Sequence, residues 1–121
     1  MKKTVLIAAA ALLTASAAGA RAPGPLPRNA VPVDCTITVA FGSYAAGIDG
    51  ATLTRMERTL RIDRRVRRFT RHPWGREGEV TLCVYTRGHA AAGPLSRQLR
   101  AMIPPRPRGP VDVTLLPNRV Y

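Results

Sequence analysis

The sequence is poor in aromatic residues, in acidic residues and in cysteine. Aromatic residues make up 5% of the 121 residues, so few large rings are available to build a core. Asp and Glu number 7 against 19 Lys and Arg, for a formal net charge of +12. This balance excludes an acidic disordered chain and favours attraction to anions. The length limits the chain to one domain and excludes a large multi-domain enzyme.

The sequence also lacks an apolar run of the roughly 20 residues that a membrane crossing needs. Its longest apolar run extends from Val5 to about Leu13, follows Lys2 and Lys3, and precedes small residues that end at Ala20. This pattern is typical of a Sec signal peptide over residues 1–20, cleaved near Ala20. We therefore expect an exported protein, periplasmic or secreted, that does not span a membrane. No cysteine directly follows the apolar run, so no lipid anchor is expected.

The sequence has only two cysteines, Cys35 and Cys83. In an exported chain they predict one disulfide bond. It would close a loop of about 50 residues, for which chain entropy gives about 4 kcal/mol of stabilisation. The alternative is a metal site with His72 and His89, but no pair among these four residues has the spacing of zinc ligands. We expect neither a metal nor a cofactor.

Proline and glycine, in contrast, are frequent and divide the chain. Residues 21–33 carry four prolines and no apolar period, which predicts a linker before one domain over residues 34–121. Alternating and helical patterns predict strands at 35–41, 66–71, 79–86 and 111–115 and helices at about 50–62 and 93–103. Asp49 is placed to cap the first helix. Val66 and Phe69 can share a face of the second strand only through a bulge, and residues 72–75 fit a turn.

This order of elements predicts an α+β fold, a ferredoxin-like βαββαβ two-layer sandwich. Two helices would cover one face of a four-stranded antiparallel sheet. Cys35 and Cys83 would then lie on neighbouring central strands. If both follow the alternation, Ile37, Val39 and Phe41 share a face with Cys83, while Val80, Leu82 and Val84 lie on the other face. Both faces would then be partly apolar. Either the open face is covered by the Pro-rich segments or a partner, or one register is shifted by one residue.

The predicted topology is similar to that of the RNA recognition motif, but the residues that carry its function are missing. That family stacks bases on aromatic residues of its first and third strands, whereas residues 79–85 contain one aromatic residue and no basic-Gly-aromatic start. Heavy-metal chaperone domains share the topology and need a CxxC motif in the first loop, where this chain has GSYAAG at residues 42–47. We therefore expect no nucleic acid or metal partner.

Catalysis has candidate residues but no motif. The candidates are the two histidines His72 and His89, the hydroxyl of Ser43, and the carboxylates of Asp49, Glu77 and Glu79. None lies in a pattern that specifies a reaction. We expect no enzyme, with a small hydrolase using His72 or His89 as one alternative. A second alternative is a protease inhibitor or propeptide-like module that presents the tail at residues 117–121.

The densest feature is a group of arginines around one tryptophan: Arg64, Arg65, Arg67, Arg68, Arg71 and Arg76 with Trp74. We call these residues the arginine cluster. Guanidinium groups bind phosphate and carboxylate, and the indole could anchor an anionic envelope component or an acidic protein surface. Alternatively, the charges protect an edge strand, Trp74 folds over the open sheet face, and a GC-rich genome enriches arginine. We expect a non-catalytic binding module, and the sequence does not specify its oligomeric state.

Overall fold

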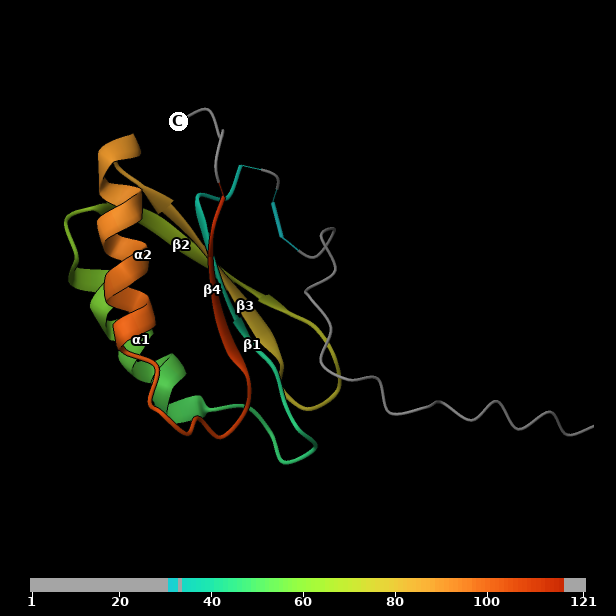
Figure 1. Cartoon of the computed structure of the whole chain (residues 1–121). Helices are drawn as coiled ribbons and strands as arrows, with labels where there is room; N and C mark the ends of the chain where they lie inside the picture. The colour runs from blue at the N-terminus through green and yellow to red at the C-terminus, as the bar shows by residue number, and fades with distance from the viewer. Residues whose placement is uncertain (1–30, 33, 117–121) are drawn as a thin grey trace, which may run out of the picture.

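A computed structural model describes residues 31–32 and 34–116. The predicted signal peptide, the linker apart from residues 31–32, and the tail at residues 117–121 lie outside the described residues. The elements, in chain order, are β1 (Ile37–Phe41), α1 (Gly50–Ile62), β2 (Val66–Pro73), β3 (Val80–Thr86), the short 3-10 helix η1 (His89–Ala91), α2 (Ala92–Ala101) and β4 (Val111–Leu115) (Figure 1).

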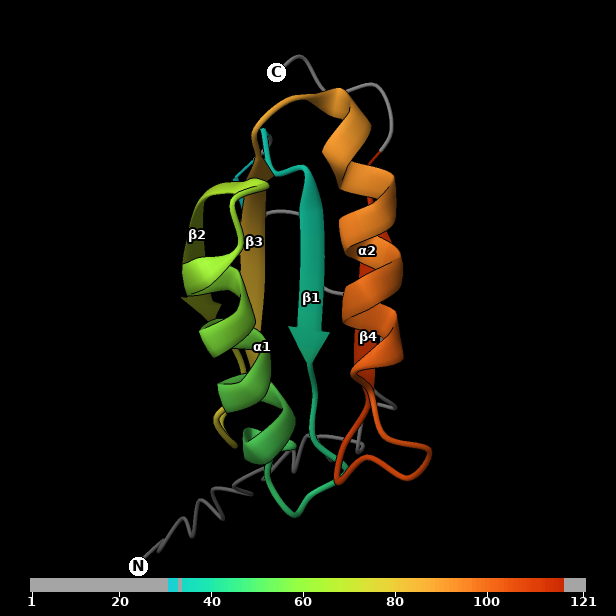
Figure 2. The same cartoon turned by 90° about the vertical axis from the view of Figure 1, so that its left-hand side faces the viewer.

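The strands form one antiparallel sheet in the order β2-β3-β1-β4. Both helices lie on the same side of this sheet, next to each other (Figures 1 and 2). The predicted α+β class, with four antiparallel strands and two helices, is confirmed. β1 and β3 are neighbours at the centre of the sheet, as the predicted disulfide between Cys35 and Cys83 requires. We refer to the side that the helices cover as the helix face and to the other side as the open face.

The main core lies between the helix face and the helices. In β1, Ile37, Val39 and Phe41 pair with Val84, Leu82 and Val80 of β3, respectively, and all six are buried. They pack with Met56 and Leu60 of α1 and with Leu95 and Leu99 of α2. The spacing of these helical residues puts them on one stripe of each helix, which explains why the helices lie against the sheet.

The predicted face of Cys35 was wrong. Cys35 and Thr36 precede β1, so Cys35 does not continue the alternation that begins at Ile37. The predicted disulfide with Cys83 is confirmed, with the two Cα atoms 5.5 Å apart, and it lies on the open face. The large aliphatic residues of β1 and β3 and Phe41 therefore share the helix face. On the open face, the buried hydrophobic cluster of the described residues consists of the two cysteines and Tyr85, with Leu116 packed against it.

The second strand contains the predicted bulge, between Val66 and Arg68. The bulge brings Val66 and Phe69 to the main core, as their sequence spacing demanded. The predicted position of the turn, however, was wrong. β2 continues to Pro73, and the N–H of Trp74 donates to the carbonyl of Glu79 at 2.9 Å, so the reversal occupies residues 75–78. Gly75 and Gly78 have positive φ angles there, which glycine adopts without strain.

The predicted cap of the first helix is confirmed. The N–H of Thr52 donates to Oδ1 of Asp49 at 3.1 Å, and the N–H of Arg108 donates to Oδ2 at 3.3 Å. Burial alone would raise the pKa of Asp49, but these hydrogen bonds outweigh it and the pKa is lowered. Asp49 thus fixes the start of α1 and ties it to the segment that leads into β4.

Candidate functional site

The arginine cluster, predicted as a single site, is divided between the two faces of the sheet. Arg71 lies on the same side of β2 as Phe69 and faces the helices, where its Nε lies 3.3 Å from Oε1 of Glu57. Arg68 lies opposite Tyr85 on the open face. Alternation along a strand sends side chains to opposite faces, so nearness in sequence did not bring these arginines together.

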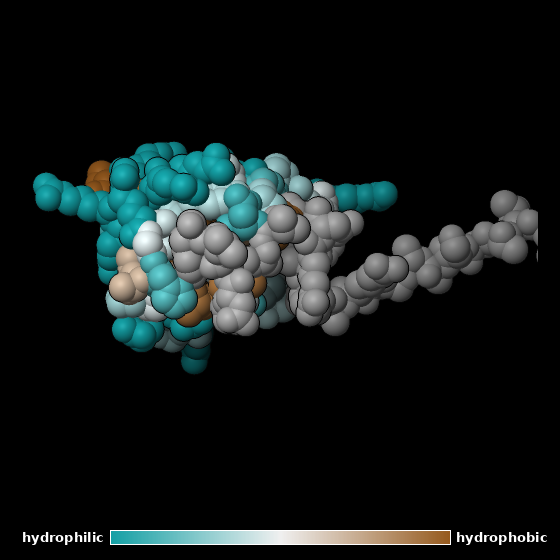
Figure 3. All heavy atoms as spheres, turned by 90° about the horizontal axis from the view of Figure 1, so that it is seen from above, coloured by the Kyte–Doolittle hydropathy of each residue, from teal (hydrophilic) through white to brown (hydrophobic). Residues whose placement is uncertain are grey.

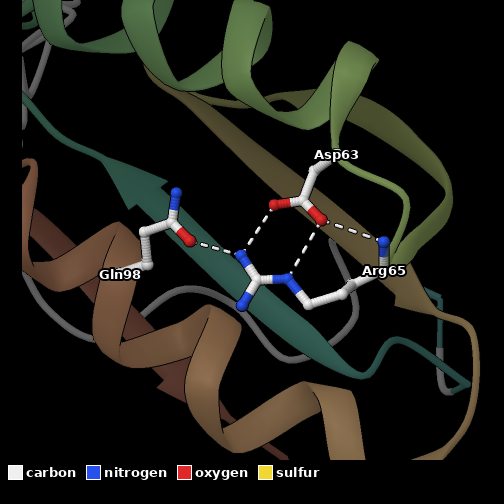
Figure 4. A network of polar contacts seen from close by, with 3 residues as sticks. All are labelled: Asp63, Arg65 and Gln98. Atoms are coloured by element: carbon white, nitrogen blue, oxygen red, sulfur yellow. Dashed lines mark hydrogen bonds and ion pairs between the residues drawn. The ribbon is translucent and has the colours of Figure 1, made fainter.

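Arg65 is held on the helix side by a network of polar contacts (Figure 4). Its guanidinium binds both carboxylate oxygens of Asp63, at 3.0 and 2.7 Å, and also donates to the side-chain oxygen of Gln98 in α2. The hydrogen bonds from Arg65 lower the pKa of Asp63, and those to Asp63 raise the pKa of Arg65. Arg65 therefore joins the turn after α1 to α2.

Glu57 holds Arg71 together with a second arginine. Besides Arg71, it binds Arg61, whose Nη2 lies 3.1 Å from Oε2. The Glu57 side chain is 10% exposed, whereas those of Arg61 and Arg71 are 61% and 56% exposed. Arg61 also lies over the ring of Phe69, 6.0 Å from its centroid. Arg65 and Arg71, two members of the cluster, are thus engaged by carboxylates of the fold itself.

The open face has a different arrangement at the bulge. The guanidinium carbons of Arg67 and Arg68 lie 5.8 and 4.2 Å, respectively, from the centroid of the Tyr85 ring. Consecutive residues of a regular strand face opposite sides, so the bulge is what allows both to reach one ring. Both arginines are exposed, and neither forms an ion pair within the described part of the chain.

Tyr85 is fixed beneath these two arginines. Its ring is buried, and its hydroxyl donates to Oδ1 of Asp34 at 3.1 Å. Burial raises the pKa of Tyr85, and the hydrogen bond to Asp34 raises it further. The ring is therefore a neutral, fixed platform. We call Arg67, Arg68 and Tyr85 the open-face site.

Arg64 and Arg76, two further members of the arginine cluster, lie at opposite ends of β2 and do not form one patch with the open-face site. Arg64 lies in the turn before β2 and Arg76 in the turn after it, and both are exposed. The eight residues of β2 separate them by about 25 Å. Neither forms an ion pair among residues 34–116.

Trp74 lies against the sheet. Its indole N–H donates to Oγ1 of the buried Thr81 at 3.0 Å, so the ring folds towards the open face, as in the alternative interpretation of the sequence. It also borders an open hollow of about 370 Å³ at the hairpin, lined by Arg71, Pro73, Trp74, Gly75, Gly78, Glu79 and Val80. The indole is half-buried, and its N–H is engaged within the fold.

The catalytic candidates are placed as follows. A ring nitrogen of His72 lies 2.7 Å from the hydroxyl of Thr70, and no carboxylate hydrogen-bonds this ring within the described ranges. His89 begins η1 on the exposed surface. Among residues 34–116, no group of His, Cys, Asp and Glu is arranged to hold a metal ion.

Ser43 and Glu77 are brought together, although no sequence pattern pairs them. The hydroxyl of Ser43 donates to Oε2 of Glu77 at 2.5 Å and accepts the N–H groups of Ala45 and Gly47. This hydroxyl therefore shapes its own loop and ties it to the hairpin. Glu77 is exposed, so the pair does not lie in a closed site.

The sequence-based prediction missed Tyr85, which belongs to the open-face site, and Asp34, which accepts its hydrogen bond. The bulge was predicted from Val66 and Phe69, but its effect on the two arginines depends on which residue of β3 lies opposite. That residue is Tyr85, which pairs with Arg68. The contact depends on the register between β2 and β3, which no local sequence motif specifies.

Comparisons with known proteins gave no match to a family model, to a curated protein or to a solved structure. Within the part of the chain that the structure describes, no helix has the length and apolar character needed to cross a membrane. The disulfide suits an oxidising, exported environment.

Proposed function

We propose that the chain is a small exported binding module whose open-face site holds an anionic group of its partner. One observation carries the proposal: the bulge brings Arg67 and Arg68 to the same ring, and no carboxylate of the described residues forms an ion pair with either. Two neighbouring guanidinium groups repel each other, and an anion between them removes that cost. Guanidinium also matches the geometry of phosphate and carboxylate.

The proposal includes the finer fold assignment and the cellular location. Read from the β4 edge, the strand order is β4-β1-β3-β2, and each helix joins two strands that flank a third. These split βαβ units support the ferredoxin-like assignment, which does not itself specify a function. The disulfide supports export, and we propose cleavage near Ala20 and a periplasmic or secreted protein.

The test is titration calorimetry of the oxidised full chain with two soluble probes, tripolyphosphate and a hexaglutamate peptide. The variant Arg67→Gln with Arg68→Gln should weaken binding of the preferred probe by at least tenfold, because each lost charge-assisted hydrogen bond contributes about 1.5–3 kcal/mol. The stronger probe identifies the bound group as phosphate or carboxylate.

The matched control is Arg106→Gln with Arg108→Gln, which removes the same charge from exposed positions in the segment before β4. It should leave affinity within about twofold, the residual effect expected for distant screened charges. Equal losses in the two double variants would show attraction to net charge alone, and the open-face site would be wrong. Failure of the unsubstituted chain to bind either probe would also overturn the proposal.

A further inference from the structure

A second group of exposed charges lies on the outside of the helices. Its members are exposed arginines of α1, of the turn after α1 and of α2: Arg55, Arg58, Arg61, Arg64, Arg97 and Arg100. The neighbouring carboxylates, Glu57 and Asp63, are already engaged in ion pairs. We call this group, with Ile62, the helix-layer surface. Its charge is strongly positive, and within the described residues Arg61 is the only one of the six arginines that forms an ion pair.

Ile62 is the one large hydrophobic side chain of this otherwise charged surface. It is 83% exposed, and within the described residues the only other exposed large hydrophobic side chain is Tyr44. Positions 55, 58 and 62 follow the spacing of one helical stripe, so Arg55 and Arg58 lie on the same side of α1 as Ile62. An exposed isoleucine is common by itself. Here it ends a stripe of arginines, with Arg61 and Arg64 beside it in sequence.

The placement of the helices makes this surface accessible. α1 and α2 lie next to each other on the outside of the sheet, and no other described element covers them (Figure 2). Seen from above, hydrophilic residues dominate the left, helix side of the molecule, with small apolar spots between them (Figure 3). An extended partner could meet both helices together.

We propose that the helix-layer surface docks on an anionic phospholipid bilayer, with Ile62 entering the boundary between headgroups and acyl chains. Surface binding to such bilayers combines an apolar side chain with cations that meet lipid phosphates. The end of α1 supplies both, and the neighbouring carboxylates of Glu57 and Asp63 are already in ion pairs. The proposal does not depend on the open-face site, because it uses different residues on the other side of the sheet.

The test places a fluorescent reporter at position 62 in the oxidised full chain. The variant Ile62→Trp is mixed with vesicles of brominated phosphatidylglycerol and phosphatidylcholine, and the signal of Trp74 is subtracted using the unsubstituted chain. Emission from position 62 should shift to the blue and be quenched at least twofold. The apolar run at residues 5–13 is present in every variant, so a position-specific signal is needed in place of total binding.

The matched reporter is Tyr44→Trp, at the other exposed hydrophobic position, in the loop between β1 and α1. Its emission should change little, because the proposal places only the helix-layer surface in the lipid. Equal quenching at positions 44 and 62 would overturn the proposal, as would no change at position 62. Quenching of equal size with brominated phosphatidylcholine alone would overturn the role of charge.

Charge variants complete the test in the Ile62→Trp background. Arg58→Gln with Arg64→Gln should raise the lipid concentration for half-maximal quenching at least fivefold, since neither residue forms an ion pair in the described ranges. Arg106→Gln with Arg108→Gln should leave it within twofold. Arg67→Gln with Arg68→Gln should do the same, so failure of the open-face site and failure of lipid docking give different results. If all three double variants weaken quenching equally, a specific helix-layer surface is wrong.

Discussion

Arg68 and Arg71 lie three residues apart on β2, but the two faces of the sheet give them different surroundings. Arg71 faces the helices and meets a carboxylate of α1, whereas Arg68 meets the ring of Tyr85. The carboxylate of Asp34 accepts the hydrogen bond of the Tyr85 hydroxyl. A run of like charges can thus contain residues that stabilise the fold and residues available to a partner. Charge density alone does not separate the two groups.

The two faces also differ in what holds them together, and the largest predicted effect follows from this. The helix face has a packed core, whereas the cluster on the open face is joined by the Cys35–Cys83 disulfide. Replacing Cys35 and Cys83 by alanine should lower the free energy of unfolding by about 4 kcal/mol, because the bond closes a long loop in the unfolded chain. Urea denaturation of the two proteins measures this difference.

Reduction with dithiothreitol gives a matched control for that prediction. It should destabilise the natural chain by a similar amount and leave the alanine variant unchanged. A loss below about 1 kcal/mol, too small for closure of so long a loop, would show that the open face does not rely on the bond.

Much of the fold could be predicted from local patterns. Alternation located the strands, Asp49 marked the start of α1, and the spacing of Val66 and Phe69 required the bulge. The face of Cys35 could not be predicted in this way, because alternation holds only inside a strand and the chain bends before Ile37. The position of the hairpin turn was also misjudged, because a proline at residue 73 suits the end of an edge strand as well as a turn.

The site was less predictable because its contacts are non-local. The sequence showed that arginines were dense around Trp74, but it did not show that Glu57 of a different element would engage Arg71. It also gave no sign that Tyr85 would lie opposite Arg68. Charge runs reveal where cations are, and only the three-dimensional neighbours decide which cations are already neutralised.

One substitution on each face should destabilise the fold by a different amount. Glu57→Gln removes the partner of Arg61 and Arg71 and should lower the free energy of unfolding by about 1–2 kcal/mol, a range kept low because both arginines are more than half exposed. Arg68→Gln should cost only about 0.5–1 kcal/mol, the value of an exposed cation–π contact. Urea denaturation measures both changes.

Binding should show the opposite order. Arg68→Gln should weaken the preferred anionic probe several-fold, whereas Glu57→Gln should leave its affinity nearly unchanged. If Glu57→Gln weakened binding as much as Arg68→Gln did, the separation of structural and available arginines by face would be wrong.

The smallest effects should appear at opposite ends of the pH scale. On the helix side, the pKa of Asp63 is lowered by hydrogen bonds from Arg65, so the stability it contributes is complete above its unfolded pKa of about 4 and is lost as pH falls through its folded pKa. On the open face, burial raises the pKa of Tyr85, so its contribution is complete below about pH 10 and is lost as pH rises through its folded pKa. Denaturation across the pH range measures both losses.

Two variants assign these losses to their faces. Asp63→Asn should reduce the loss of stability between pH 5 and pH 3 and leave the alkaline side unchanged, although Asp49, whose pKa is also lowered, keeps part of the acid dependence. Tyr85→Phe should reduce the alkaline loss and leave the acid side unchanged, because phenylalanine has no proton to release. If either variant altered both sides equally, the substitution would be acting on the whole fold and not on one face. Separate responses would show that the two faces of the sheet differ in the pH at which they lose stability, just as they differ in the partners of their arginines.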